Sequence, residues 1–273
     1  MLKIKTILKE VLGNLFLTWT VARYDNKAAF QGHYFGLVWE IVNPLIQIGI
    51  YWFVFDAIRE RAPVIFNGIE VPFLSWMLVG MSAWLFMNGA TRTASKSVHN
   101  KIGLVSKMKF PMSVLPAMSI ASKLTAYLVT VSIVIIILLF SGITPSIFWL
   151  QYIYYLFAML TFLYFFALLN STITVLFRDY QNLLTPFMRF MFFFSGPIWR
   201  MDEMVAIPDW FVRLMDLNPF SYIITGFRNT FLGGAFFWEH AYTTIFFWLL
   251  ILLIAIISSH LHLKFRSKFI DLS

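Results

Sequence analysis

The twelve residues from Val129 to Phe140, VTVSIVIIILLF, carry no charge and belong to one of six long apolar stretches. A helix needs about 17 or more mostly apolar residues to cross roughly 30 Å of hydrocarbon. The stretches that meet this length are 35–57, 72–91, 111–140, 147–177, 183–199 and 241–263. A chain of 273 residues cannot bury six such helices in a water-soluble core. We therefore expect an all-α integral membrane protein with six transmembrane helices in one domain, 1–273.

Basic residues gather in alternate loops, which predicts the orientation in the membrane. Lysine and arginine are concentrated before the first stretch, between the second and third, and after the sixth, and the loop 92–109 contains no acid. The positive-inside rule then places both termini in the cytoplasm, and six crossings fit that parity. The same loops account for the net charge of +8, so we expect no nucleic acid partner. The prediction is a multi-pass protein of the cell membrane.

Residues 2–20 have the pattern of a helix that lies in the membrane interface instead of crossing it. One helical face is apolar and consists of Ile4, Ile7, Leu8, Val11, Leu12, Leu15 and Phe16. The opposite face carries Lys3, Lys5, Lys9, Glu10 and Asn14. Two roles fit this pattern equally, a simple membrane anchor and a contact with a partner.

Four polar residues recur in the first apolar stretch at spacings of 3, 4 and 4, and we call them the polar stripe: Glu40, Asn43, Gln47 and Tyr51. These spacings place the four side chains on one face of a helix. Polar groups within a membrane normally face protein or water, because contact with lipid is expensive. The stripe therefore either joins helices by hydrogen bonds or lines a hydrated pathway. A second face of this kind, on the fifth stretch, contains Thr185, Arg189, Phe192 and Gly196.

Lysine and arginine also occur at the ends of the spans and within one of them. Arg92 and Lys96 lie at the cytoplasmic end of the second stretch, where long cationic side chains can snorkel to the interface. Lys123 is different, because it lies within the third stretch, 12 residues past Pro111. It must snorkel, pair with an acid or face a polar cavity, and the sequence leaves all three alternatives open.

The fifth stretch is short and is interrupted by Ser195-Gly196-Pro197, since proline cannot continue the hydrogen-bond ladder of a helix. The following segment, 203–238, is partly apolar and contains Pro208 and Asn218-Pro219. Non-helical backbone at membrane depth must be covered by protein. We therefore expect re-entrant helices on the outer side between the fifth and sixth spans.

Several kinds of chemistry are absent from the sequence. There is no Gly-Lys dipeptide, and hence no P-loop that could cradle ATP phosphates. There is no cysteine, no H-E-x-x-H motif and no G-x-S-x-G elbow, while His260 and His262 fall on different helix faces. We expect no metal site, no bound cofactor and no covalent catalysis by this chain.

Five segments, in order along almost the whole chain, together resemble the membrane subunits of type-2 ABC exporters of polysaccharides and teichoic acids. They are Gly36–Leu45 (GLVWEIVNPL), Asn100–Pro111 (NKIGLVSKMKFP), Phe177-Arg178-Asp179, Ser195-Gly196-Pro197-Ile198, and Leu217–Arg228. Within this family the chain looks most like the permeases that export wall teichoic acid in Gram-positive bacteria. Permeases for capsule and for lipopolysaccharide O-antigen share the same motifs and remain the alternative.

The resemblance implies a homodimer of this chain bound to two copies of a separate ABC ATPase, which uses ATP and Mg²⁺. It also implies a substrate polymer attached to undecaprenyl pyrophosphate, made on the cytoplasmic leaflet and moved outward. The absence of a P-loop agrees, because the energy must then come from another subunit. An anionic cell-wall polymer of the teichoic acid class is the expected cargo.

Three groups of candidate residues follow from these expectations. Cations form charge-assisted hydrogen bonds with phosphate, so the candidates for the lipid pyrophosphate are Arg23, Lys27, Arg92 and Lys96. A conduit at the dimer interface, between the first and fifth spans, would be lined by Glu40, Asn43, Gln47 and Tyr51 and by Arg189 and Phe192, with Arg189 available to pair with Glu40. The segment 100–110 is expected to be a short helix that docks in the ATPase through Asn100, Lys101, Leu104, Lys107 and Phe110.

Two other classes of transporter fit parts of the sequence. A drug exporter of the same fold would have the same topology, but it would need a mostly apolar cavity, which the polar stripe argues against. A secondary transporter typically has inverted repeats and broken helices in both halves. Here only the second half is interrupted.

Overall fold

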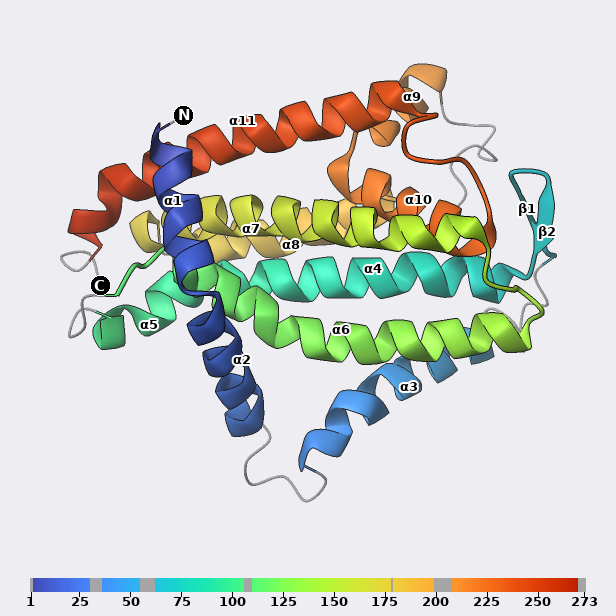
Figure 1. Ribbon diagram of the computed structural model, residues 1–273, viewed down its shortest axis with the longest axis horizontal. Helices are drawn as coiled ribbons and strands as arrows, with labels where there is room; N and C mark the ends of the chain where they lie inside the picture. The colour runs from blue at the N-terminus through green and yellow to red at the C-terminus, as the bar shows by residue number, and fades with distance from the viewer. Residues whose placement is uncertain are drawn as a thin grey trace.

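The structure is a computed structural model that describes residues 2–29, 36–54, 62–105, 110–177, 179–198 and 208–269. Four long helices run side by side and form the body of the molecule (Figure 1): α4 (Phe73–Ala94), α6 (Val114–Phe140), α7 (Tyr152–Leu176) and α11 (Ala241–Phe265). Each belongs to a segment that is long and apolar enough to cross a membrane. They confirm the all-α fold, and they lie where the second, third, fourth and sixth spans were predicted.

The four long helices differ in how much of their surface faces protein. In the most apolar window of each segment, 78% of the residues around α4 are buried, against 22% in α6 and in α11. Helix α4 is therefore central, while α6 and α11 present most of their apolar surface outward, where lipid is the expected solvent. The core packs between α4, α6, α7 and α11 and is completed by a shorter helix, α10 (Pro219–Leu232).

The first predicted span is helical throughout its described part, from the 3-10 turn η1 (Gly36–Val38) through α3 (Trp39–Trp52) to a π turn at 53–54, and residues 55–57 lie outside the described residues. The fifth predicted span contains a short helix, α8 (Tyr180–Phe194), of 15 residues. At about 1.5 Å per residue, 15 residues cover only some 22 Å. Helix α8 stops before Gly196, whose φ of +63° suits glycine and turns the chain into Pro197. Six crossings therefore remain a prediction, although the break at Ser195-Gly196-Pro197 lies where the sequence placed it.

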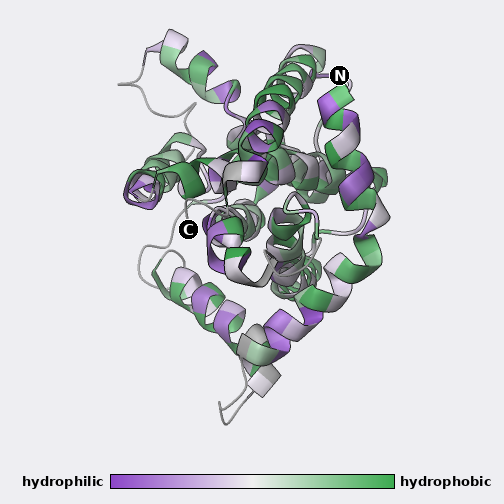
Figure 2. Cartoon of the chain, turned by 90° about the vertical axis from the view of Figure 1, so that its left-hand side faces the viewer, coloured by the Kyte–Doolittle hydropathy of each residue, from purple (hydrophilic) through white to green (hydrophobic). Residues whose placement is uncertain are grey.

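The predicted interfacial segment, 2–20, forms two helices instead of one. They are α1 (Leu2–Gly13) and α2 (Leu15–Ala29), and both lie across the direction of the long helices (Figure 1). Figure 2, which looks at this end of the bundle, shows hydrophilic and hydrophobic residues alternating along them. Ile7 is completely buried against the bundle, whereas Leu12 and Phe16 on the same apolar face are exposed. One side of this face thus packs on protein and the other is free to contact lipid.

Both chain ends and α5 (Ser97–Val105) gather at one end of the bundle, the predicted cytoplasmic end (Figure 1). A carboxylate on α1 joins two other elements there. Glu10 accepts a hydrogen bond from Ser113 and pairs with Arg266 at 2.7 Å, in the turn η4 (Arg266–Lys268) that follows α11. The interfacial helices are therefore fixed to the start of α6 and to the end of α11.

The opposite end, predicted to be outside, carries a β-hairpin that the sequence analysis did not predict. Strands β1 (Val64–Phe66) and β2 (Ile69–Val71) pair antiparallel around Asn67 and Gly68, both of which have positive φ. An Asn-Gly pair between apolar residues is the usual signal for such a turn. The Asn67 amide donates to Oδ1 of Asn229 at 3.2 Å and so docks the hairpin on α10.

Helices α9 (Asp209–Asp216) and α10 lie between α8 and α11, as the re-entrant pair was expected to do. Asn218 caps α10 by accepting from the Phe220 amide at 3.0 Å, and Pro219 occupies the first helical turn. The side chain of Asn218 also donates to Ser195 Oγ at 2.9 Å, which ties the start of α10 to the break after α8. A 3-10 turn, η3 (Ile147–Gln151), begins the fourth span.

Candidate functional site

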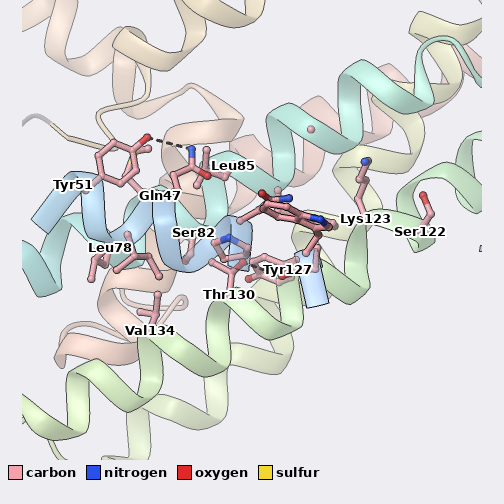
Figure 3. A pocket seen from close by; sticks show the side chains of 18 of the residues that line it. Gln47, Tyr51, Leu78, Ser82, Leu85, Ser122, Lys123, Tyr127, Thr130 and Val134 are labelled. Carbon is pink, nitrogen blue, oxygen red and sulfur yellow. Dashed lines mark hydrogen bonds between the residues drawn. The ribbon is translucent and has the colours of Figure 1, made fainter. Parts of the chain in front are cut away.

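A cavity of about 280 Å³ lies between α3, α4 and α6, and we call it the α3 cavity. Three members of the polar stripe, Asn43, Gln47 and Tyr51, line it from α3 (Figure 3). The fourth member, Glu40, belongs to α3, but its side chain lies outside the described residues. The stripe therefore faces α4 and α6 of its own protomer. The outward face of α3 is apolar and is formed by Ile41, Leu45, Ile46 and Ile50.

The stripe does not join helices by hydrogen bonds in the described part of the chain. Its one hydrogen bond runs within α3, from Gln47 Nε2 to Tyr51 Oη at 3.5 Å. Asn43 has no hydrogen-bond partner among the described residues. Interhelical bonding was one of the two interpretations that the sequence left open. The other interpretation, a hydrated pathway bordered by the stripe, stays a prediction.

Lys123 also lines the α3 cavity, from α6. Figure 3 places it at one end of the cavity and the Gln47–Tyr51 pair at the other. The neighbouring carbonyl, that of Ser122, accepts a hydrogen bond at 2.9 Å from Asn26 near the end of α2. Lys123 forms no ion pair within the described chain. Of the three alternatives for Lys123, pairing with an acid is absent among the described residues, while its exposed side chain fits both snorkelling and facing the cavity.

The predicted face of the fifth span lies on α8 and away from the α3 cavity. Arg189 is exposed and forms no ion pair with any described residue. Phe192 is partly buried and packs its ring against that of Trp84 on α4, with centroids 5.6 Å apart. The rest of the outward face of α8 is formed by Leu183, Phe187, Phe190 and Phe193. Within one protomer the structure does not bring Arg189 and Phe192 together with the stripe.

A second cavity, of about 520 Å³, opens at the predicted cytoplasmic end, and we call it the α5 cavity. Its lining is polar and basic: Lys96, His99, Asn100, Thr174 and Gln181. The Gln181 amide donates to Ser95 Oγ at 3.0 Å and to Thr174 Oγ1 at 2.8 Å. Sequence reasoning singled out Lys96 and Asn100 but missed Thr174 and Gln181. They come from α7 and α8, and no periodic pattern in the sequence connects them with the 92–109 loop.

The candidate coupling residues have different environments. Lys101 on α5 pairs with Asp25 on α2 at 2.5 Å, and 26% of its side chain remains exposed. Phe110 packs, partly buried, against a small core around the start of α6. Leu104 belongs to α5, but its side chain is outside the described residues, as is the whole of Lys107. The predicted helix at 100–110 thus overlaps the second half of α5.

The four cations predicted to meet a lipid pyrophosphate do not form one cluster. Arg23, Lys27, Arg92 and Lys96 are all exposed. Lys96 lines the α5 cavity, whereas neither Arg23 nor Lys27 lines a cavity described above. Among the described contacts, none joins the two cations of α2 to the other two. Their role in substrate binding stays a prediction.

Arg228 is buried and connects three parts of the structure. From the sequence it was named only as the last residue of the segment Leu217–Arg228. Arg228 on α10 is 5% exposed and donates to three carbonyls: Nε to Trp76 at 3.3 Å, and its terminal nitrogens to Gly196 at 3.0 Å and to Pro197 at 2.8 Å. Its guanidinium also lies 3.4 Å from the ring centroid of Trp76. Arg228 therefore holds α10, α4 and the break after α8 together.

Nothing in the described residues provides a metal centre, because no group of three or more histidine, cysteine, aspartate or glutamate side chains comes together there. The candidate functional features of the described structure are instead two cavities lined in part by polar residues, an interrupted helix and an interfacial helix pair.

The comparison with protein families decides the family. The profile of ABC-2 type transporters matches residues 17–232, which include α3, both cavities and α10. The chain belongs to the ABC-2 type transporter family. This permease is a multi-pass membrane protein, and its family forms the membrane component of transporters.

Three curated relatives extend this assignment over almost the whole permease. Two are named O-antigen export system permease protein RfbA, from Klebsiella pneumoniae. They are 26% identical to this chain, one over 95% of this chain and 96% of the relative, the other over 85% and 87%. The third carries the same name, is from Myxococcus xanthus, and is 22% identical over 81% of this chain and 80% of the relative. The resemblance to polysaccharide permeases is thus confirmed at family level, while nothing in these names favours teichoic acid.

Proposed function

We propose that this permease exports a lipid-linked polysaccharide of the O-antigen class from the cytoplasm to the outer face of the membrane. The observation that carries the proposal is the match to RfbA of Klebsiella pneumoniae over 95% of this chain. Teichoic acid, the cargo expected from the sequence, has no such support. The energy source in the proposal is a separate ABC ATPase present in two copies, which agrees with a sequence without a P-loop.

A second copy of the permease completes the proposal. A long polymer cannot be enclosed in one cavity of about 280 Å³, so it needs a continuous conduit. The outward faces of α3 and α8 are rich in exposed aliphatic and aromatic side chains. Such faces suit either lipid or another copy of the chain. We place the conduit at the interface of two copies, beside α3 and α8, where the aromatic rings of α8 can stack on sugars.

Deletion of the gene tests the proposed cargo. We expect the polysaccharide to disappear from the cell surface and to accumulate inside the cell attached to its lipid carrier. The measurement is extraction of the lipid-linked polymer, followed by analysis of its sugars and of its phosphorus content. Sugar repeats with little phosphorus support the O-antigen class. A polyol phosphate backbone would contradict it in favour of teichoic acid, and an unchanged surface polymer would contradict export altogether.

The α5 helix gives a prediction about coupling to the ATPase. In the variant Lys101→Glu we expect loss of ATPase co-purification and of export, since the docking surface changes the sign of one charge. Because Lys101 pairs with Asp25, the swap variant Asp25→Lys/Lys101→Glu is the matched control. The swap restores the intramolecular pair, but it should not restore ATPase binding. If the swap recovers both binding and export, Lys101 acts only within the protomer and the docking role is wrong.

A further inference from the structure

Lys123 in the α3 cavity has a position and a charge that the export mechanism above does not use. It is nine residues beyond Val114, where α6 begins, or about 14 Å along the helix axis. The hydrogen bond from Asn26 to the Ser122 carbonyl brings the end of the interfacial helix α2 to the same level. If α2 lies in the membrane interface as the sequence predicts, Lys123 is expected where the headgroups of the inner leaflet meet the hydrocarbon. A charge at this depth is stabilised by water or by an anion.

The lining of the α3 cavity favours an anion over a cation. Among the described residues that line it, Lys123 is the only one with a formal charge. Two of the polar side chains that α3 contributes to the lining, Asn43 and Gln47, are amides, which supply N–H donors. Asn43 makes no hydrogen bond with a described residue, and Gln47 uses one N–H toward Tyr51. One cation together with free amide N–H groups matches the oxygen atoms of a phosphate, with which cations form strong, charge-assisted hydrogen bonds.

Apart from Asn26, Ser82, Ser122 and Thr130, the rest of the described lining is mainly aliphatic and aromatic, which suits the hydrocarbon adjacent to a headgroup. It includes Leu78 and Leu85 from α4 and Val134 from α6 (Figure 3), and the stacked rings of Phe86 and Tyr127, whose centroids are 4.5 Å apart. The volume, about 280 Å³, is close to the lower limit of roughly 300 Å³ for small-molecule sites. It can hold a headgroup and the first part of a chain, but no polymer. A phosphate that arrives with its own hydrocarbon satisfies both parts of this lining.

We propose that the α3 cavity binds the phosphate group of an inner-leaflet lipid, with Lys123 as its charge partner and the amide of Asn43 as a hydrogen-bond donor. The phosphate could belong to an anionic phospholipid or to the pyrophosphate of a polyprenyl carrier. Only the carrier source rests on the proposed function. In either case the lipid would occupy the angle between α2 and α3, next to the stripe.

Protection of Lys123 from acylation tests the site. The full-length permease is purified in dodecyl maltoside, a detergent without phosphate, and treated with a water-soluble amine-reactive ester, and the acylation rate of each lysine is measured by mass spectrometry. Adding phosphatidylglycerol or undecaprenyl pyrophosphate to the micelles should slow acylation of Lys123 about fivefold or more, because only the unoccupied fraction reacts. Lys5, exposed on α1 and outside the candidate binding residues, is the control and should change much less.

The outcomes separate the possible sources. Protection by phosphatidylglycerol identifies a phospholipid, and protection by undecaprenyl pyrophosphate alone identifies the carrier. Protection by inorganic phosphate alone, equal protection of Lys5 and Lys123, or no protection by any of the three would overturn the proposal. So would a Lys123 that remains unreactive in dodecyl maltoside alone. These outcomes do not depend on which polymer the gene-deletion experiment finds.

Two variants exclude a simple change in folding. Asn43→Leu should leave Lys123 reactive in dodecyl maltoside and should remove most of its protection by the anionic lipid. Lys123→Gln should retain severalfold less anionic lipid after purification than Lys5→Gln, measured by mass spectrometry of the intact protein. Equal retention by the two lysine variants would contradict the assignment of Lys123.

Discussion

The variant Arg228→Met should unfold at a much lower temperature than the unchanged protein and should fail to export. Methionine fills part of the space but leaves the carbonyls of Trp76, Gly196 and Pro197 without their donor. A buried polar group that loses its partner costs about 1–3 kcal/mol. Because three carbonyls are affected at once, we expect a loss on the order of 3–5 kcal/mol, a large fraction of the stability of a typical domain.

Thermal unfolding of purified protein in detergent, followed by size-exclusion chromatography, measures this loss. The matched control is Arg213→Met, because Arg213 is exposed on α9 and most surface substitutions change stability by less than about 0.5 kcal/mol. Arg228→Lys should fall between the two, since a single ammonium cannot reproduce the planar fork that reaches several carbonyls. An unchanged unfolding temperature for Arg228→Met would show that the three carbonyls find other donors.

The effect on export follows from what Arg228 connects. Two of its acceptors, Gly196 and Pro197, form the break that ends α8, and the third lies on the central helix α4. The approach is close, because a Cβ added to Gly80 of α4 would lie 2.5 Å from the Arg228 guanidinium. Without the arginine, the end of α8 loses its connection to α4 and α10. A conduit beside α8 would then lose one of its walls.

The features that the sequence predicted correctly are those determined by length or by local chemistry. Apolar stretches long enough to cross a bilayer identified α4, α6, α7 and α11. Proline and glycine after Ser195 identified the end of α8, because their backbone restrictions act within a few residues. The amphipathic pattern located the interfacial segment, although it did not predict the division between α1 and α2 at Asn14.

The features that the sequence did not determine depend on which surfaces meet. Periodicity placed Asn43, Gln47 and Tyr51 on one face, but it could not say that this face turns toward α4 and α6. In a membrane both lipid and neighbouring helices are apolar, so hydropathy does not distinguish the two kinds of contact. The partners of Arg228 and the lining of the α5 cavity come from segments that are far apart in the sequence. Only the packed structure brings them together.

The variant Gly226→Ala should disrupt the contact between α10 and α7. A Cβ at position 226 would lie 2.0 Å from Cε1 of Tyr155, far inside van der Waals contact. Tyr155 cannot easily move away, because it is 2% exposed and its ring packs against those of Tyr222 and Phe227. Overpacking of this kind costs about 1–3 kcal/mol and sometimes more. We expect destabilisation in that range, against an intrinsic preference of about 1 kcal/mol for alanine in helices.

Gly49→Ala provides the control, because α3 leaves nothing within 4 Å of a Cβ at that position. At position 49 the only expected effect is the higher intrinsic helix preference of alanine over glycine, so the unfolding temperature of Gly49→Ala should stay the same or rise. If Gly226→Ala behaves like Gly49→Ala, then α10 does not pack on Tyr155 as the structure has it. Adding Tyr155→Leu to Gly226→Ala should recover part of the loss, because the smaller side chain vacates the space that the new methyl group needs. Recovery of stability without recovery of export would then assign the Tyr155 ring a role beyond packing.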